Sequence, residues 1–281
     1  GRRAGAVAGF AVAPLAATAP SGEAVLVVVK SGVVAEVCRL LRGRLEPTRP
    51  LVLCAKGLDA TGPRLASDAV QAVLPGQLVM VLSGPSFADE VRADKPTAVA
   101  LAAAPVDLPQ ANWLAHALHT RHFRPYVSDD PIGVQLGGAA KNVVAIATGL
   151  ARGLDIGANG EAALVTRGIA EMSRLGAVMG GKPATLMGLA GLGDLVLTCA
   201  GPHSRNFRFG QAIARGLDPD RAEVEVGLAE GRHAARLIPD LARVRGVELP
   251  IAEAVRAVLD GRLDLATAID ALLERPLGRE V

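Results

Sequence analysis

The chain has 281 residues, of which 50% are hydrophobic, 21% are charged and 2% are aromatic, and its formal net charge is +2. This composition excludes an intrinsically disordered chain, which would combine low hydrophobicity with high net charge. The small net charge also argues against a general nucleic-acid-binding protein, and the length favours two domains over one. Because there are only five Phe, one Trp and one Tyr, we expect a core built from Ala, Val and Leu.

The first twenty residues resemble a secretory signal, since Arg2 and Arg3 precede an apolar stretch over 4–19 that ends in Ala-Thr-Ala. Pro14 interrupts this stretch, and most of its residues are the weakly hydrophobic Ala. We therefore expect neither a signal peptide nor a membrane span, for which the stretch is too short.

The first part of the chain alternates strand and helix signals. Apolar and β-branched runs predict strands over residues 24–29, 51–55, 78–83, 97–102 and 123–127. Helical spacing of apolar residues predicts helices between them, over 33–41, 64–73 and 108–118. Strands separated by helices predict an α/β sheet that is at least partly parallel.

After residue 129 the strand signals disappear. Helical patterns follow over 131–150, 160–180, 206–215, 226–245, 251–259 and 265–274. In the second of these, Arg167, Glu171 and Arg174 are spaced to face one another. We therefore predict an α/β domain over residues 1–128 and an all-α domain over residues 129–281.

The three cysteines, Cys38, Cys54 and Cys199, are widely spaced and form no CxxC pair or Cys/His cluster with metal-ligand spacing. We expect them to be reduced thiols and ordinary buried residues of a cytoplasmic protein. We expect no metal site.

Lys141 is the only charged residue of the run IGVQLGGAAKNVVAIATGLA, whose composition predicts a helix buried nearly all round. A buried ammonium must be paired or must face a polar cavity. Gly137 and Gly138, one turn earlier, leave room for another backbone or for a ligand. The alternative is a lysine whose long side chain carries the charge to the surface.

Asp194 is the only formal charge in the run MGLAGLGDLVLTCAGPHS. The glycines before it suit a tight path with close backbone approach. A lone carboxylate and the lone ammonium of Lys141 are candidates to pair across a site. The alternative is that Asp194 only caps a helix that begins at the next residue.

Two further patterns place polar residues at positions that bind anions. Ser204-Arg205-Asn206 opens a predicted helix, where a cap, free N–H groups and a guanidinium together favour phosphate. Taken alone, an ordinary capped helix with a surface arginine explains this pattern better.

Lys56 and Ser86 follow predicted strands, and ligands of open α/β sheets bind beyond the carboxyl ends of strands. A lysine in such a place can also be a solvated surface charge.

The chain resembles the bacterial type of NAD(P)-dependent glycerol-3-phosphate dehydrogenase from about residue 24 to the C-terminus. The matching runs are AVLVVVKS, LCAKGL, SGPSFADEV, IGVQLGGAAKNVVAI, ANGEAALVTRGIAEMSRLG and GLAGLGDLVLTCAGPHSRNFRFG. The resemblance implies a Rossmann-type N-terminal domain and an all-α C-terminal domain. It also implies reduction of dihydroxyacetone phosphate to sn-glycerol 3-phosphate with NADH or NADPH, for glycerophospholipid synthesis in the cytoplasm, by a homodimer.

The resemblance further implies the roles of individual residues. Lys141 is implied as general acid and base, and a neighbouring Lys56 would bring its pKa down toward neutral. The substrate-binding residues implied are Lys56, Gly84, Ser86, Lys141, Asp194, Ser204, Arg205 and Asn206. The cofactor-binding residues implied are Lys56, Ala88, Arg205, Leu228 and Glu230.

One expected feature of this family is not found. No GxGxxG motif follows a strand in this chain, and residues 1–23 lie outside the resemblance. We therefore expect the first βαβ unit, about 30 residues, to be missing. One alternative to the enzyme is therefore a non-catalytic remnant that dimerises or binds glycerol phosphate without a cofactor. A second alternative, independent of the missing unit, is a β-hydroxyacid-type dehydrogenase with a carboxylate-bearing substrate, against which the Ser-Arg-Asn and Ala-Lys-Gly runs argue.

Overall fold

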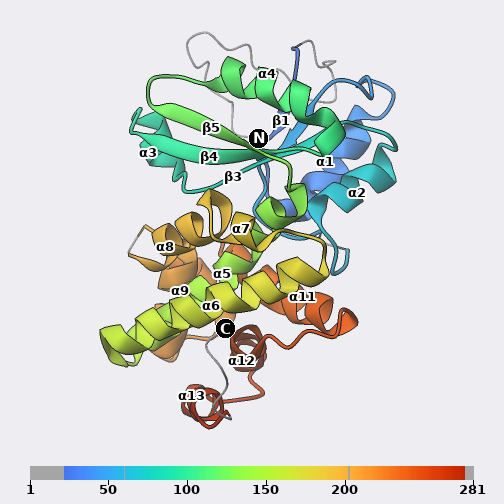
Figure 1. Ribbon diagram of the computed structural model, residues 1–281. Helices are drawn as coiled ribbons and strands as arrows, with labels where there is room; N and C mark the ends of the chain where they lie inside the picture. The colour runs from blue at the N-terminus through green and yellow to red at the C-terminus, as the bar shows by residue number, and fades with distance from the viewer. Residues whose placement is uncertain (1–21, 60, 202, 276–281) are drawn as a thin grey trace.

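The computed structural model describes residues 22–59, 61–201 and 203–275. A sheet with its helices forms one part of the molecule, and a group of helices forms the other (Figure 1). The expectations about a signal segment and a missing first βαβ unit concern the start of the chain, where residues 1–21 lie outside the described ones.

The sheet has five strands in the order β1-β2-β3-β4-β5, so neighbours in the chain are neighbours in space. Strands β1 to β3 are parallel to one another and β4 is parallel to β5, whereas β3 and β4 are antiparallel. The predicted, partly parallel α/β sheet is therefore confirmed. The strands are β1 (Val25–Val27), β2 (Leu51–Leu53), β3 (Val79–Ser83), β4 (Thr97–Ala102) and β5 (Phe123–Ser128).

Helices cover both faces of the sheet because its central strands are apolar on both sides. Leu51 and Leu53 of β2 belong to the core cluster with α1 (Val34–Leu41) and α2 (Ala66–Val73). Val52, between them, faces the other way and packs with α4 (Leu108–Leu118). This alternation with a period of two is the geometry of a strand, and it explains the continuous apolar runs.

The turn after β3 reverses the chain direction. Gly84 has a φ of +144°, and a Cβ there would lie 3.0 Å from the Cα of Val99 on β4. Only glycine suits both the dihedral angle and this close approach. The chain then forms α3 (Ala88–Arg92), a short helix that sequence analysis missed, and returns as the antiparallel β4.

From Pro131 onward every regular element of the described residues is helical. The helix predicted over 226–245 begins later than expected, at Glu230, because Gly227, with a φ of +83°, ends a preceding helix that sequence analysis missed. The elements are α5 (Pro131–Gly153), α6 (Gly157–Val178), α7 (Pro183–Leu186), a π-helical turn (Leu189–Gly193), α8 (Asp194–Cys199), α9 (Arg205–Ala214), α10 (Pro219–Val226), α11 (Glu230–Val244), α12 (Pro250–Leu259) and α13 (Leu265–Leu273).

Helix α5 runs through the middle of the helical part. It begins with Pro131 after Asp130, whose carboxylate accepts a hydrogen bond from the Gly133 N–H at 2.8 Å. Every residue from Gly133 to Ala151 is buried, as the apolar run predicts. A Cβ on Gly149 would lie 2.0 Å from a backbone oxygen of α9, so glycine is what lets α5 and α9 pack this closely.

Other sequence expectations can be compared with the described residues. The core consists mainly of Ala, Val and Leu side chains, as expected. Cys38, Cys54 and Cys199 are free thiols, and burial raises the pKa of each to about 11. Within the described ranges, no cluster of His, Cys, Asp or Glu is arranged to hold a metal ion, and no helix is both long and apolar enough to cross a membrane.

Candidate active site

Lys141 and Asp194 form the centre of the candidate site. The Lys141 Nζ donates to Asp194 Oδ1 at 2.5 Å and to Thr198 Oγ1 at 2.8 Å. Lys141 is 5% exposed and Asp194 is 1% exposed, so this is a buried ion pair. The alternative of a lysine that carries its charge to the surface is therefore wrong.

Asp194 is also not a helix cap. It is the first residue of α8, the cap position is Gly193, and no side-chain cap bond is formed there. The predicted pairing of the two lone charges, 53 residues apart in the chain, is what the structure contains.

A second ammonium shares the same carboxylate. Lys56 Nζ lies 2.8 Å from Asp194 Oδ2 and donates to the Gly84 carbonyl at 2.7 Å and weakly to Ser86 Oγ at 3.4 Å. Oδ2 accepts no hydrogen bond of good geometry, so its interaction with Lys56 is an ion pair without good alignment. Two protonated lysines and one carboxylate leave one net positive charge around the buried Asp194.

The fold assembles these groups from three distant segments. Lys56 follows β2 and Gly84-Ser86 follows β3, so both lie beyond the carboxyl ends of parallel strands, as predicted. The π-helical turn passes close to Gly137 of α5. A Cβ at Gly137 would lie 2.6 Å from the Ala190 carbonyl oxygen, so only glycine leaves room for the turn. This close approach brings Asp194, at the end of that turn, next to α5.

The environment shifts the pKa of Lys141 strongly. Burial, and after it the positive charge of Lys56, lower the pKa of this ammonium from 10.5 to about 8. The charge and hydrogen bond of Asp194 act in the opposite direction. The sequence predicted the influence of Lys56, but burial is the larger cause. With a pKa of about 8, Lys141 can both give and take a proton near neutral pH.

A chain of amides links the centre to two more helices. Asn142 Nδ2 donates to the Lys56 carbonyl at 3.2 Å, and Asn206 Nδ2 donates to Asn142 Oδ1 at 2.9 Å. The Gly231 N–H then donates to Asn206 Oδ1 at 2.9 Å. Asn206, a predicted site residue, therefore helps to hold α5, α9 and α11 around the strand ends.

Sequence analysis missed two polar residues of the site, Asn142 and Thr198. Asn142 follows Lys141 in the same apolar run, and Thr198 lies one helical turn after Asp194. A polar residue at these offsets from a lone buried charge is the signal that could have identified both.

Ser204 and Arg205 begin α9 as predicted. The Ser204 hydroxyl is buried and accepts from the Phe207 N–H at 3.2 Å, so it acts as an ordinary helix cap. Arg205 is exposed at the first position of the helix. Ala88 and Leu228 are also exposed, and no described hydrogen bond joins them to the Lys141 centre, so their cofactor roles stay predictions.

Glu230, at the start of α11, lies near several positively charged side chains. Burial raises the pKa of its carboxyl, while the charges of Arg205, Lys141, Lys30 and Lys56 lower it. Four cations therefore influence Glu230, and two of them, Lys56 and Lys141, also pair with Asp194. This excess of positive charge suits a doubly negative phosphate.

Comparison with known proteins decides the family. The sequence models described as NAD-dependent glycerol-3-phosphate dehydrogenase N-terminus and C-terminus match residues 10–108 and 130–270. A "Glycerol-3-phosphate dehydrogenase [NAD(P)+]" of Bradyrhizobium sp. is 47% identical over 264 residues, which are 94% of this chain and 79% of that protein. One of Azorhizobium caulinodans is 49% identical over 260 residues, 90% of this chain and 76% of that protein.

Solved structures agree. The crystal structure of glycerol-3-phosphate dehydrogenase from Coxiella burnetii has a TM-score of 0.84 and 42% identity, and covers 90% of this chain and 77% of that one. The chain belongs to the family of NAD-dependent glycerol-3-phosphate dehydrogenases. A D-mandelate dehydrogenase with NADH and anilino(oxo)acetate, 11% identical with a TM-score of 0.58, shares the fold alone, with 91% of this chain and 80% of that one covered.

Membership of this dehydrogenase family corrects one expectation. The N-terminal family model matches from residue 10, so the resemblance begins before residue 24. The alternative of a non-catalytic remnant gains no support from relatives that carry the dehydrogenase name over most of this chain.

The glycerol-3-phosphate dehydrogenase family implies NAD or NADP as cofactor, and the residues present fit such a group. The parallel strands β1, β2 and β3 end at the same edge of the sheet, next to the four cations. At the end of β3 the hydroxyl of Ser83 is buried and has no hydrogen-bond partner in the described part of the chain. A polar group without a partner beside a positive site is suited to a polar, phosphate-bearing molecule.

Proposed function

We propose that this chain reduces dihydroxyacetone phosphate to sn-glycerol 3-phosphate with NADH or NADPH, and catalyses the reverse oxidation. The observation that carries the proposal is the buried Asp194 carboxylate shared by Lys141 and Lys56 at the strand ends. Such an arrangement is suited to moving one proton at an oxygen atom that becomes negative during the reaction.

The nicotinamide ring of the bound cofactor supplies or accepts the hydride. Lys141 Nζ donates a hydrogen bond to the carbonyl oxygen of the substrate and transfers its proton as that oxygen becomes a hydroxyl. Asp194 holds the Lys141 ammonium in place, and Lys56 adds positive charge that stabilises the developing negative oxygen.

The remaining site residues bind and orient. We propose that the phosphate is held by Arg205 and Asn206 at the start of α9, with Ser204 capping that helix. The other substrate contacts we propose are Lys56, Gly84 and Ser86. The cofactor contacts we propose are Lys56, Ala88, Arg205, Leu228 and Glu230.

Three further parts of the proposal concern the whole molecule. We propose that residues 1–128 form a partial dinucleotide-binding domain and residues 129–281 the helical substrate-binding and catalytic domain. We propose the cytoplasm as the compartment, which the free thiols favour, and a homodimer as the working form. The product would serve glycerophospholipid synthesis.

The test is the loss of nicotinamide absorbance with the 281-residue chain and dihydroxyacetone phosphate, with NADH and NADPH in parallel. We expect turnover that falls by about 100-fold or more in Lys141→Ala, the size of a lost general acid. Lys182→Ala is the matched control, because that lysine is exposed and pairs with Asp129 away from the site. Folded protein without turnover on either cofactor, or an unimpaired Lys141→Ala variant, would contradict the proposal.

A further inference from the structure

One segment of the sheet part packs into the core of the helical part. It connects β2 to α2, begins with Lys56, and its described residues are 56–59 and 61–65, which we call the Lys56 loop. Leu58 and Leu65 pair with each other in an antiparallel bridge. Both are buried in the core cluster that contains the apolar residues of α5 and α6. The loop is therefore held by the helices as well as by its own sheet.

Hydrogen bonds inside the Lys56 loop make it a compact unit. The buried Asp59 carboxylate accepts from the Thr61 hydroxyl at 2.5 Å and from Arg64 Nε at 2.7 Å. The Asp59 N–H donates to the Arg64 carbonyl at 3.0 Å. Because the two sides of the loop are tied together, a displacement at its α2 end also displaces its β2 end. At that end Lys56 Nζ lies 2.8 Å from Asp194 Oδ2.

Gln135 of α5 holds the place where the Lys56 loop enters α2. Its side chain is buried, its Oε1 accepts from the Ser67 N–H at 3.0 Å, and its Nε2 donates to Ser67 Oγ at 2.9 Å. Nε2 also donates to the Pro131 carbonyl at 3.0 Å. These partners fix the orientation of the amide, because only its oxygen can accept from an N–H and only its nitrogen can donate to a carbonyl.

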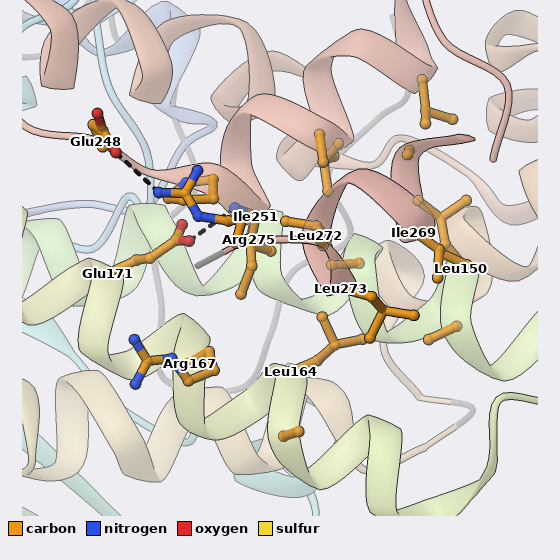
Figure 2. Close-up of a pocket in the computed structure, with 18 of the residues that line it drawn as sticks. Leu150, Leu164, Arg167, Glu171, Glu248, Ile251, Ile269, Leu272, Leu273 and Arg275 are labelled. Carbon is orange, nitrogen blue, oxygen red and sulfur yellow. Dashed lines mark hydrogen bonds and ion pairs between the residues drawn. The ribbon is translucent and has the colours of Figure 1, made fainter. Parts of the chain in front are cut away.

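The start of α2 has no cap of its own. Leu65 is at the cap position and has no side-chain acceptor, so Gln135 satisfies a free N–H of the first turn from another helix. The same arrangement occurs at α12, where the cap position is Leu249 and Glu171 of α6 accepts two N–H groups at 2.8 and 3.3 Å (Figure 2). The bonds at α12 join two helices of the helical part, whereas those at α2 join α5 to the Lys56 loop.

We propose that Gln135 is a positioning residue, which holds the Lys56 loop against α5 and thereby keeps the Lys56 ammonium on the Asp194 carboxylate. Asn142 bonds the Lys56 carbonyl at one end of the loop, and Gln135 is the second anchor, at the other end. Gln135 and Lys141 belong to the same helix, so one element sets the positions of both ammonium groups. The effect of Gln135 on catalysis rests on the proposed function, whereas its effect on the position of Lys56 does not.

The first test measures the titration of Lys141 directly and needs no turnover. The chain has five lysines, so NMR of protein labelled isotopically at lysine Cε gives few signals, and Lys141→Met identifies the signal of Lys141. The charge of Lys56 helps to lower the pKa of Lys141 to about 8, so release of Lys56 in Gln135→Leu should move the midpoint to higher pH. Glu171→Leu removes the equivalent cap of α12 and is the matched control, with an unmoved midpoint.

The second test measures the reaction. In Gln135→Leu we expect kcat for dihydroxyacetone phosphate to fall roughly 10-fold with little change in KM, a part of the roughly 100-fold or more that loss of an oxyanion donor costs. Ser67→Ala removes one of the two bonds and should give smaller changes in the same direction in both tests. Ser67→Thr keeps the hydroxyl and the N–H and should behave like the unchanged chain. Circular dichroism checks the fold of each variant.

Several outcomes would overturn this role of Gln135. One is an unmoved Lys141 midpoint in folded Gln135→Leu, and another is a midpoint that moves equally far in Glu171→Leu. If Gln135→Leu does not fold, an unmoved midpoint in Ser67→Ala, at a partly exposed position, overturns the proposal instead. An unchanged chain without turnover contradicts the proposed function, and the NMR titration then still decides whether Gln135 positions Lys56.

Discussion

The pKa of Lys141 gives a prediction for the pH dependence of both reaction directions. A shift from 10.5 to about 8 raises the neutral fraction of Lys141 at pH 8 from about 0.3% to about half. In energy the shift corresponds to about 3 kcal/mol, mostly from burial of the ammonium. Ketone reduction needs the protonated amine and alcohol oxidation needs the neutral amine.

The expected profiles follow directly. For reduction of dihydroxyacetone phosphate, kcat/KM should be constant below pH 8 and fall about tenfold per pH unit above it. For oxidation of glycerol 3-phosphate, kcat/KM should rise about tenfold per pH unit up to pH 8 and then level off. The phosphate of either substrate titrates near pH 6, about two units lower, so it does not produce this change.

The perturbation that tests the assignment is Lys141→Met, which keeps the length of the side chain and removes the titrating group. We expect kcat to fall by about 10² to 10⁴ and the pH dependence near 8 to disappear. The assay is nicotinamide absorbance in both directions across the pH range, with Lys182→Met as the control. If the variant keeps the same pH dependence, or the unchanged chain shows none near pH 8, the role of Lys141 as proton donor is refuted.

Three further predictions follow from the same structure. Asp194→Asn should lower the pKa of Lys141 below 8, because the carboxylate now raises it, and the reduction profile should begin to fall at lower pH. Burial raises the pKa of Glu171 from 4.5 to about 7, so its contribution to stability is full below pH 4.5 and is lost as the pH rises through 7. Denaturant melts at pH 4.5 and 8 should differ by about 3 kcal/mol from this group, and a Glu171→Gln variant that keeps the full difference would contradict the assignment. Gly210→Ala places a Cβ 2.3 Å from a backbone oxygen of α5 and should cost about 2 kcal/mol, whereas Gly62→Ala, with no atom within 4 Å, should be near neutral in the same melts.

Most strands and the longer helices can be predicted from local patterns of the sequence. Apolar β-branched runs and helical spacing locate the five strands and the longer helices, because one element's periodicity reflects which of its faces is buried. Short elements such as α3 and α7 carry too few residues for a period to be read. The division between α10 and α11 depends on the positive φ of Gly227. The sequence alone does not show whether a given glycine adopts a positive φ.

The site likewise has residues that the sequence identifies and contacts that only the tertiary structure determines. Lys141 and Asp194 can be found from sequence, because a lone charge in an apolar segment must have a partner wherever the chain folds. Which segments meet is a property of tertiary packing: Gly137 lets the π-helical turn approach α5, and this contact sets Asp194 beside the lysine. The sharing of Asp194 with Lys56 depends on how the strand ends sit over α5, which no local pattern specifies.

Tertiary structure alone decided the chemistry of Lys141 in quantitative terms. The sequence supplied the ammonium and a neighbouring lysine, but the first cause of the lowered pKa is burial. Burial is a sum over everything packed around the group, here the helices beside α5 and the loops at the strand ends. Desolvation therefore cannot be read from residue identities in order along the chain, whereas the need for a partner to a buried charge can.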